Sequence, residues 1–433
     1  MSWMERLYTP LLWLLLPLAL LRLLWRSRRV PAYRQRWRER LAFYPVAPSP
    51  AAVWLHAVSV GEVQAAQPLI RHLRDRDAAN GVLVTTTTPT GAQRLAGLFS
   101  EPVSHLYTPF DLPPVVRRFL DRVRPRLVVV METEVWPNLL KECAARRIPV
   151  ILANARLSER SASGYARLGR FARATFGRFA LVAAQSASDA ARLQRLGVPG
   201  ERLRVTGSAK FDLHLPGSLR ERAEVMRRTW GSERPVWVAA STHDGEEELL
   251  LAAHRWVRAQ WPTALLVLVP RHPERFERVA SLVLRQGWAL ARRSRAEPCT
   301  AKTGVFLGDS MGELPVFLAA ADAAFIGGSL VPVGGHNLVE AAAVGVPAAI
   351  GPHSFNFASV TETLIQAGAA VQVADARALA RQITAWLGDA AERARIGENG
   401  LWVVAENRGA TQRLIELVEE QLAGERQRPA GGS

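Results

Sequence analysis

FIGGSLVPVGGHNLVEAAAVGVPAAIG, residues 325–351, is the stretch that decides the fold class. The apolar run at 323–326 ends on a glycine pair, and a loop that closes on a second glycine pair follows it. The Ala-rich run at 338–344 favours a helix, and a Gly-Val-Pro sequence ends it before another apolar run at 348–350. Strand, glycine loop, helix and strand in this order form the repeating unit of a parallel α/β sheet.

The loop of this unit permits two interpretations. Paired glycines let the backbone approach a ligand closely, and a helix N-terminus offers unpaired N–H groups to an anion. This interpretation favours a nucleotide-sugar or phosphate site, although the spacing matches neither the dinucleotide fingerprint nor the P-loop. Asn337 and Glu340 stand three residues apart, so they can equally be an N-cap and its reciprocal acid. Both interpretations stay open.

Length and composition narrow the class of protein. The 433 residues are too many for one ordinary core and predict two domains with additional segments. Two cysteines provide neither a disulfide framework nor a thiolate metal site. The net charge of +16, nearly all from arginine, favours anionic partners such as acidic lipid or a phosphorylated substrate. A nucleic acid is not expected, because no zinc-finger spacing or aromatic-interleaved basic groove is present.

The N-terminal segment predicts membrane attachment. Residues 11–21 (LLWLLLPLALL) are apolar throughout, but this run is shorter than the ~20 residues of a spanning helix. Eight arginines follow between Arg22 and Arg40, against the single acid Glu39. Such a cluster is attracted to an anionic leaflet and keeps the body of the chain in the cytoplasm. We expect residues 1–30 to be an anchor that either spans the membrane or lies in its interface.

The remaining chain contains two series of short apolar runs that alternate with helix-favouring segments. The expected strands are 52–55, 82–86, 127–131, 150–153 and 181–184, and then 236–240, 265–269, 305–306, 323–326, 348–350 and 370–373. The pattern loosens at 207–216, where we expect a linker, and the helical stretch after Ala378 could cross back to the first half. The alternation predicts two parallel, doubly wound sheets. Their ligands bind beyond the carboxyl ends of the strands, so we expect a site in a cleft between two domains.

Polar residues cluster directly after these expected strands. The clusters are 56–62, 132–138, Lys210, 241–246, 270–272 and 311–313. A carboxylate there can remove a proton from a hydroxyl nucleophile if its pKa is raised, and Arg271 suits a phosphate leaving group. Each residue also has a structural explanation; Ser59 and Glu62, for example, make a capping box. No histidine–acid cluster has metal-ligand spacing, so the chemistry is expected to need neither a metal nor another cofactor.

Eight segments taken together resemble the 3-deoxy-D-manno-octulosonic acid (Kdo) transferases of lipopolysaccharide synthesis. They are HAVSVGE (56–62), METEVWPN (131–138), GSAKFD (207–212), STHDGEE (241–247), PRHPERF (270–276), MGEL (311–314), GGHNLVEAA (334–342) and GPHSFNF (351–357). The resemblance implies the GT-B fold, in which two Rossmann-like domains face each other across a cleft. It places an acceptor domain at 31–215 and a CMP-sugar donor domain at 216–433.

The resemblance also implies an activity and residue roles. These enzymes move Kdo, with inversion, from CMP-Kdo to a hydroxyl of a lipid A precursor (lipid IVA) at the cytoplasmic side of the inner membrane, a step of cell envelope biogenesis. Glu62 would be the general base, and Glu132 and Lys210 would assist the transition state. The residues expected to bind CMP-Kdo are Pro270, Arg271, Met311, Gly312, Glu313, Asn337, Leu338, Val339 and Glu340.

The sequence departs from the family pattern at one place, and two other functions remain as alternatives. Leu338-Val339 stands where many family members have Pro-Leu, which alters the entry from loop to helix but not the polar positions. A GT-B transferase that uses a UDP-sugar and a lipid acceptor is the alternative enzyme. A membrane-tethered nucleotide-binding scaffold without turnover is the alternative outside enzymes.

Overall fold

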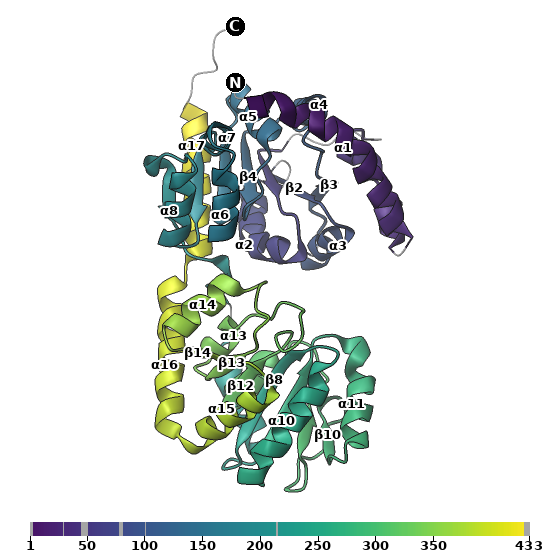
Figure 1. Cartoon of the computed structure of the whole chain (residues 1–433), viewed down its shortest axis with the longest axis vertical. Helices are drawn as coiled ribbons and strands as arrows, with labels where there is room; N and C mark the ends of the chain where they lie inside the picture. The colour runs from purple at the N-terminus through teal and green to yellow at the C-terminus, as the bar shows by residue number, and fades with distance from the viewer. Residues whose placement is uncertain are drawn as a thin grey trace. The chain divides into compact units, whose positions relative to one another are not determined.

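The computed structural model describes residues 3–28, 30–44, 51–77, 81–99, 101–213 and 215–427. These residues form two compact units (Figure 1). The first unit holds the chain up to Ala209 and again from Gly409 onward, and the second holds Lys210–Arg408. Each unit is built on one seven-stranded sheet, and every pairing in both sheets is parallel. The prediction of two parallel, doubly wound sheets is therefore confirmed.

The first sheet has the strand order β3-β2-β1-β4-β5-β6-β7. Its strands are β1 (Val53–His56), β2 (Val82–Thr86), β3 (Ser104–Tyr107), β4 (Leu127–Met131), β5 (Val150–Ala155), β6 (Leu181–Ala184) and β7 (Leu203–Val205). β1 pairs with both β2 and β4, so the chain changes its winding direction between β1 and β4. In sheets of this topology the ligand crevice lies at that switch point, beyond the carboxyl ends of the two strands.

Helices cover both faces of the first sheet. They are α1 (Trp3–Ser27), α2 (Val60–Arg76), α3 (Pro89–Leu98), α4 (Pro113–Val123), α5 (Pro137–Ala145), α6 (Glu159–Ala166), α7 (Arg170–Phe176), α8 (Ala187–Arg195) and α17 (Ala410–Gln427). Val128 and Val130 of β4 pack with α4, α5 and α7, whereas Leu127 and Val129 pack with α2 and α17. Because both faces are buried, successive strand residues are all apolar, which is why these strands could be recognised as continuous apolar runs.

The second sheet has the order β10-β11-β9-β8-β12-β13-β14, with its switch point between β8 and β12. Its strands are β8 (Val236–Thr242), β9 (Leu265–Pro270), β10 (Leu290–Arg292), β11 (Val305–Leu307), β12 (Ala323–Ile326), β13 (Ala348–Ile350) and β14 (Ala370–Gln372). Its helices are α9 (Leu219–Trp230), α10 (Glu246–Gln260), α11 (Phe276–Arg285), α12 (Leu314–Ala319), α13 (Val339–Ala342), α14 (Ala358–Gln366), α15 (Ala376–Gly388) and α16 (Ala390–Asn407).

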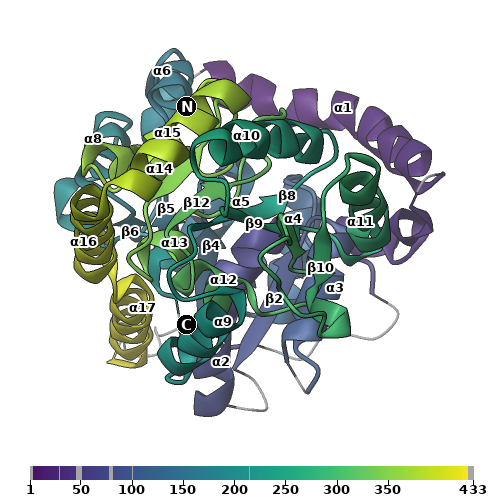
Figure 2. The same ribbon diagram turned by 90° about the horizontal axis from the view of Figure 1, so that it is seen from below.

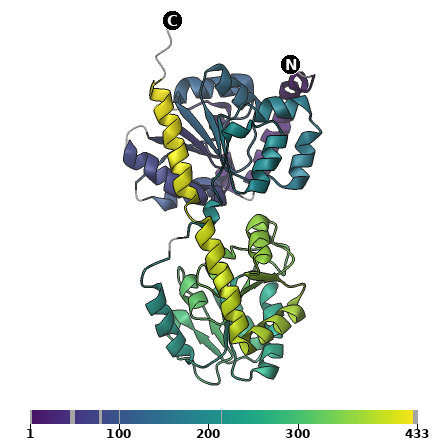
Figure 3. The same ribbon diagram turned by 90° about the vertical axis from the view of Figure 1, so that its left-hand side faces the viewer.

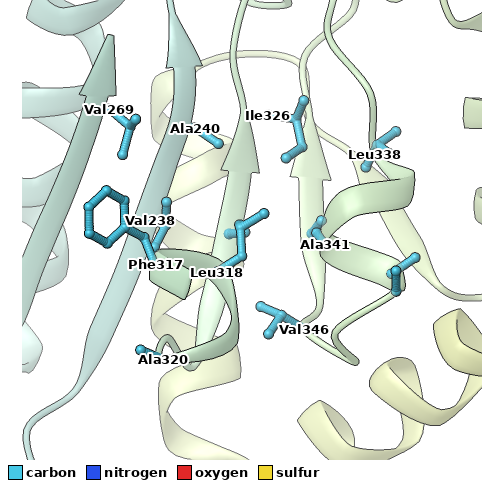
Figure 4. Close-up of a cluster of buried hydrophobic side chains, with 14 of the residues drawn as sticks. Val238, Ala240, Val269, Phe317, Leu318, Ala320, Ile326, Leu338, Ala341 and Val346 are labelled. Carbon is cyan, nitrogen blue, oxygen red and sulfur yellow. The ribbon is translucent and has the colours of Figure 1, made fainter. Parts of the chain in front are cut away.

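The core of the second unit has two layers, one on each side of its sheet. Helices α10, α11 and α15 cover one face, and α9, α12, α13 and α14 cover the other (Figure 2). In the second layer Val238 of β8 lies beside Phe317 of α12, and Leu338 at the start of α13 lies farther along the same layer, near Ile326 of β12 (Figure 4). This packing fixes the strand ends and loops from which the candidate donor residues project.

Short 3-10 helices connect several of these elements. They are η1 (Pro31–Arg34), η2 (Trp37–Leu41), η3 (Gly200–Arg202), η4 (Ala209–Phe211), η5 (Pro273–Arg275) and η6 (Arg293–Arg295). η4 carries Lys210, and η5 begins two residues after the candidate donor residue Arg271.

The chain passes from one unit to the other at positions that differ from the predicted domain boundaries. The predicted domains were 31–215 and 216–433, but the division falls at Ala209 and the chain returns to the first unit at Gly409. Leu414, Val418 and Leu422 of α17 are buried in the core of the first unit, so the final helix belongs there (Figure 3). The return crossing anticipated from the helical C-terminal stretch is thus present.

Helix α1 is longer than the apolar run that predicted it. Residues Arg6–Ser27 are long and apolar enough to cross a membrane, by length and composition alone. The helix lies along the first unit (Figure 1), where Leu12 and Leu16 pack against the core while Leu14 and Leu18 are exposed. One side of α1 therefore contacts protein, and the other presents large apolar side chains.

Candidate functional site

Glu62 lies in the first turn of α2, directly beyond the carboxyl end of β1. Ser59 is the N-cap, and its Oγ accepts the Glu62 N–H at 3.3 Å. The Glu62 carboxylate accepts the Val58 N–H at 2.7 Å and the Ser59 hydroxyl at 2.8 Å. Ser59 therefore caps the helix as predicted, but the reciprocal bonds of Glu62 go to the Val58 N–H and the Ser59 hydroxyl instead of the Ser59 N–H. The Glu62 carboxyl group is also buried and lies close to other acidic side chains, and both features affect its pKa.

Burial raises the pKa of Glu62 to about 7, against the opposing effect of its two hydrogen bonds. The negative charges of Glu132 and Glu134 raise it further. Both residues follow β4, the strand on the other side of the switch point. Burial likewise raises the pKa of Glu134, which accepts the Trp136 indole N–H at 3.1 Å. The first switch point thus brings Glu62 and Glu132 together, as their spacing after neighbouring strands predicted.

Glu132 sits in a backbone conformation that is unusual for its residue type. Its φ of 55° is in the left-handed region, and its N–H donates to the Ala153 carbonyl of β5 at 2.8 Å. Such conformations cost free energy and occur frequently at functional sites. The strained turn directs the chain away from β4 at the edge of the sheet where Glu62 also lies.

The second switch point is organised by Glu246, which belongs to the predicted polar cluster 241–246 but had no individual role assigned. Its fully buried carboxylate accepts the N–H groups of Gly328, Ser329 and Leu330 at 2.6–2.9 Å, and that of His243 at 3.0 Å. These N–H groups lie at the first glycine pair, so a protein carboxylate holds the start of the glycine loop. The anion site expected at the helix N-terminus after Asn337 stays a prediction.

The close packing of this loop explains why it contains glycine. A Cβ on Gly327 would lie 2.7 Å from the Ser241 carbonyl oxygen, and one on Gly351 would lie 2.3 Å from that of Ser329. Backbone therefore meets backbone at both positions, with no room for a side chain. The loop is a rigid support for the residues that follow it.

Arg271 lies directly beyond β9, at the same edge of the second sheet as Glu340 and His336. Its N–H donates to the Thr242 carbonyl at 3.1 Å, and its side chain is exposed. Its positive charge acts on Glu340, whose pKa burial raises and Arg271 partly lowers again. Pro270, which ends β9, is buried and can offer a ligand only backbone atoms.

Two histidines form a pair beside Arg271. The Nε2 atoms of His243 and His336 lie 2.8 Å apart, and the rings stack with a centroid distance of 5.0 Å. One nitrogen must donate and the other accept, so both rings cannot be charged. Burial, followed by His243 and Arg271, lowers the pKa of His336 to about 4. Neither histidine was named as a site residue, because the two lie 93 positions apart in the chain.

The stretch that opens α13 contains the other predicted donor residues. Asn337 Oδ1 accepts the Val339 N–H at 3.2 Å, so Asn337 does cap this short helix, although Leu338 occupies the N-cap position. Leu338 and Val339 are buried in the core and present only their backbone. Leu338 has φ −68° and ψ −21°, and the ring of proline fixes φ near that value. The departure from Pro-Leu therefore leaves the loop geometry intact.

The carboxylate of Glu313 is hydrogen-bonded to two arginines, Arg293 and Arg222. Its carboxylate accepts from Arg293 at 2.8 Å, from the Ser310 hydroxyl at 2.6 Å and from Arg222 at 3.2 Å, and these contacts lower its pKa to about 2. If this segment contacts a sugar-nucleotide donor, the groups that remain for it are the backbone around Gly312, whose φ is 78°, and the exposed side chain of Met311.

Lys210 lies at the start of the second unit rather than inside the first domain, where the predicted boundary placed it. Its Nζ lies 4.8 Å from the centroid of the Phe357 ring. Within the ranges that the structure describes, no group of three or more His, Cys, Asp or Glu side chains is arranged to hold a metal ion.

Two Rossmann-like domains in one chain, with carboxylates at one switch point and an arginine and histidines at the other, define a glycosyltransferase of the GT-B class. Residues 35–213 match the family described as 3-deoxy-D-manno-octulosonic-acid transferase (kdotransferase), and residues 234–401 match the glycosyl transferases group 1. Over 86% of this chain and 99% of the other, the fold is similar to that of HepE from Anabaena in complex with UDP, with a TM-score of 0.54 and 16% identity.

The chain belongs to the 3-deoxy-D-manno-octulosonic acid transferase family. It is 43% identical to the Haemophilus influenzae 3-deoxy-D-manno-octulosonic acid transferase, over 96% of this chain and 98% of that protein. It is 40% identical to the Bordetella pertussis enzyme of the same name, over 87% and 89% of the two chains. The resemblance inferred from the eight segments is therefore confirmed.

Proposed function

We propose that the protein transfers Kdo from CMP-Kdo to a hydroxyl of a lipid A precursor, lipid IVA, with inversion and release of CMP. The observation that carries this proposal is Glu62, a buried carboxylate with a pKa raised to about 7 at the switch point of the first sheet. A general base works best when its pKa lies near the operating pH.

Glu62 takes the proton of the acceptor hydroxyl as its oxygen attacks the anomeric carbon of Kdo. The bond from that carbon to the phosphate oxygen breaks in the same displacement, and CMP leaves with the electron pair. A single displacement inverts the configuration at the anomeric carbon. Glu132 and Lys210 assist the transition state: Lys210 supplies positive charge, while Glu132 lies close enough to Glu62 to raise its pKa.

The donor is held by residues of the second unit. Arg271 pairs with the CMP phosphate, because an arginine makes strong charge-assisted hydrogen bonds with phosphate oxygens. Glu340 and Asn337 contact the ribose hydroxyls, and among the described residues no hydrogen-bond donor to the Glu340 carboxylate is found. Pro270, Met311, Gly312, Glu313, Leu338 and Val339 contribute through their backbone or, for Met311, through an exposed side chain.

Residues 1–30 attach the enzyme to the cytoplasmic side of the inner membrane. The apolar exposed side of α1 supports this attachment, as do the arginines that follow it. Arginine-rich segments next to an apolar helix are attracted to anionic lipid. Deletion of residues 1–30 is expected to release the protein into the soluble fraction, and membrane binding that survives both the deletion and a salt wash would contradict the anchor.

One experiment tests the whole proposal. The protein is incubated with lipid IVA and either CMP-Kdo or a panel of UDP-sugars, and the product is weighed by mass spectrometry. We expect the mass of lipid IVA to increase by one or more Kdo units with CMP-Kdo and to stay unchanged with every UDP-sugar. The variant Glu62→Gln should give no mass increase with CMP-Kdo, although it still binds CMP. Transfer from a UDP-sugar would instead establish the alternative transferase, and full activity of Glu62→Gln would refute the assigned base.

A further inference from the structure

The first unit contains a cavity with an apolar lining. It has a volume of about 400 Å³ and lies between α1, the loop after β4 and the α6–α7 segment. Apolar side chains from all three line it: Leu7 and Leu11 of α1, Val135 of the loop, and Leu168, Phe171 and Phe176 around α7. A cavity with such a lining favours an apolar occupant over a polar one.

Hydrogen bonds hold the walls of this cavity in place. The Tyr8 hydroxyl of α1 donates to Asp111 at 2.9 Å, and the same carboxylate accepts the N–H groups of Asn138 and Leu139 at the start of α5. The Tyr8 ring also lies 5.7 Å from that of Phe171. Helix α1 is thus fastened through Asp111 to the start of α5, so the cavity is a formed part of the folded unit.

Positive charge lies next to this apolar space. Arg167 precedes Leu168 and Arg170 precedes Phe171, and both arginines are exposed. Neither guanidinium group makes an ion pair or hydrogen bond with any residue in the described part of the chain. An apolar cavity flanked by free guanidinium groups matches an amphiphile whose acyl chain joins a phosphorylated head group.

The cavity shares a loop with the candidate catalytic acids. Val135 lines it, and Glu132 stands three residues earlier in the same loop. Three extended residues span at most ~10 Å, a distance that a sugar head group can bridge. Leu14 and Leu18, farther along α1, are exposed and offer an apolar path from a bilayer to this region.

We infer that this cavity holds one acyl chain of the lipid acceptor, while Arg167 and Arg170 bind phosphate on its head group. The inference rests on the proposed function, since it assigns the acceptor part of the same reaction. The chain in the cavity positions the acceptor sugar beside Glu62 and Glu132, so that chain length and phosphorylation both govern acceptor affinity.

The test compares acceptors with and without their acyl chains. Leu168→Trp fills the cavity, and Ala166→Trp, on an exposed position two residues away, is the matched control. Since each buried methylene contributes ~0.8 kcal/mol, displacing two raises KM for the acylated acceptor about tenfold. We expect Leu168→Trp to leave KM unchanged for the deacylated acceptor and for CMP-Kdo, and Ala166→Trp to change none of the three.

Leu7→Trp provides a second filling variant that folding tolerates more easily, because Leu7 is 56% exposed at the cavity edge. Arg167→Gln and Arg170→Gln are expected to raise KM for the phosphorylated acceptor and not for its dephosphorylated form. Vesicle binding is measured in parallel for Leu168→Trp and Ala166→Trp and should be the same for these two variants.

Three outcomes would overturn the inference while leaving the proposed function standing. They are equal effects of both filling variants on acylated and deacylated acceptors, no effect on either, and a loss of vesicle binding that accounts for the loss of rate. The last outcome would make the cavity a contact with bulk membrane. Absence of transfer by the unmodified enzyme with either acceptor would refute the proposed function instead.

Discussion

The acidic limb of the pH–rate profile should report the titration of Glu62, and two neighbouring substitutions should move it in opposite directions. Burial raises the pKa of Glu62 from 4.5 to about 7, a shift equivalent to about 3 kcal/mol in favour of the neutral form. The base must be ionised to work, so kcat/KM falls as the pH drops below about 7. At pH 5.5 roughly 3% of Glu62 is ionised, and the rate should be about thirtyfold below its plateau.

Ser59 and Glu134 act on this pKa with opposite signs. The Ser59 hydroxyl stabilises the ionised carboxylate, so Ser59→Ala raises the pKa and moves the limb to higher pH. The charge of Glu134 destabilises it, so Glu134→Gln lowers the pKa and moves the limb to lower pH. Ser59→Ala also removes an N-cap, which costs about 1 kcal/mol of stability, so its thermal unfolding is measured alongside.

The assay measures initial rates of CMP release from pH 5 to pH 9 at saturating CMP-Kdo and acceptor concentrations below KM. Glu62→Gln is the reference, since it should lose activity about 10²- to 10⁴-fold with no recovery at high pH. A limb that stays in place in both Ser59→Ala and Glu134→Gln would show that another group titrates. A limb near pH 4.5 in the unmodified enzyme would refute the effect of burial.

Three further predictions concern the second unit. Arg271→Ala should weaken CMP binding, measured by calorimetry, about 10- to 100-fold, because a charge-assisted hydrogen bond is lost. The side chain of Arg278 is 68% exposed and paired with Asp244, so the control variant Arg278→Ala should not weaken CMP binding. Glu246→Gln replaces an acceptor of four N–H groups and should cost roughly 2–4 kcal/mol of stability, seen as a lower Tm that the exposed-site variant Glu248→Gln does not show. The pKa of His336 is lowered from 6.5 to about 4, so stability is full above pH 6.5 and decreases as the pH falls toward 4; His336→Gln should flatten this dependence of Tm on pH, and an unchanged slope would contradict it.

The sequence predicted central strands well and edge strands poorly. β4 and β12 were predicted with their observed bounds, because both faces of each are buried and every residue is apolar. β3 (Ser104–Tyr107) and β7 (Leu203–Val205) lie at the edges of the first sheet with partly exposed side chains, so neither makes a continuous apolar run.

The candidate site was predictable to the extent that its contacts are local. The Ser59–Glu62 box is encoded within four residues, and its position after a strand placed it at the sheet edge. The four N–H groups on Glu246 were not predictable, since three of them come from residues 82–84 positions later. The packing of α17 was unpredictable for the same reason. Its apolar spacing predicts an amphipathic helix but does not identify the core that the helix covers.

The separation of charge between the two switch points bears on how the reaction is organised. Glu62, Glu132 and Glu134 act on one another in the first unit, and their mutual repulsion is part of what raises the pKa of the base. In the reaction proposed above, the anionic phosphate and sugar carboxylate of CMP-Kdo would add to this repulsion as the sugar is transferred. The proposal therefore assigns the affinity for the donor to cations of the second unit, such as Arg271 and Lys210. A neutral Glu62 lowers this repulsion while the donor binds, and it must lose its proton before it can accept one from the acceptor hydroxyl. Donor binding and base activation are thus coupled with opposite signs, and a bound donor should raise the pKa of Glu62 above its value in the free enzyme.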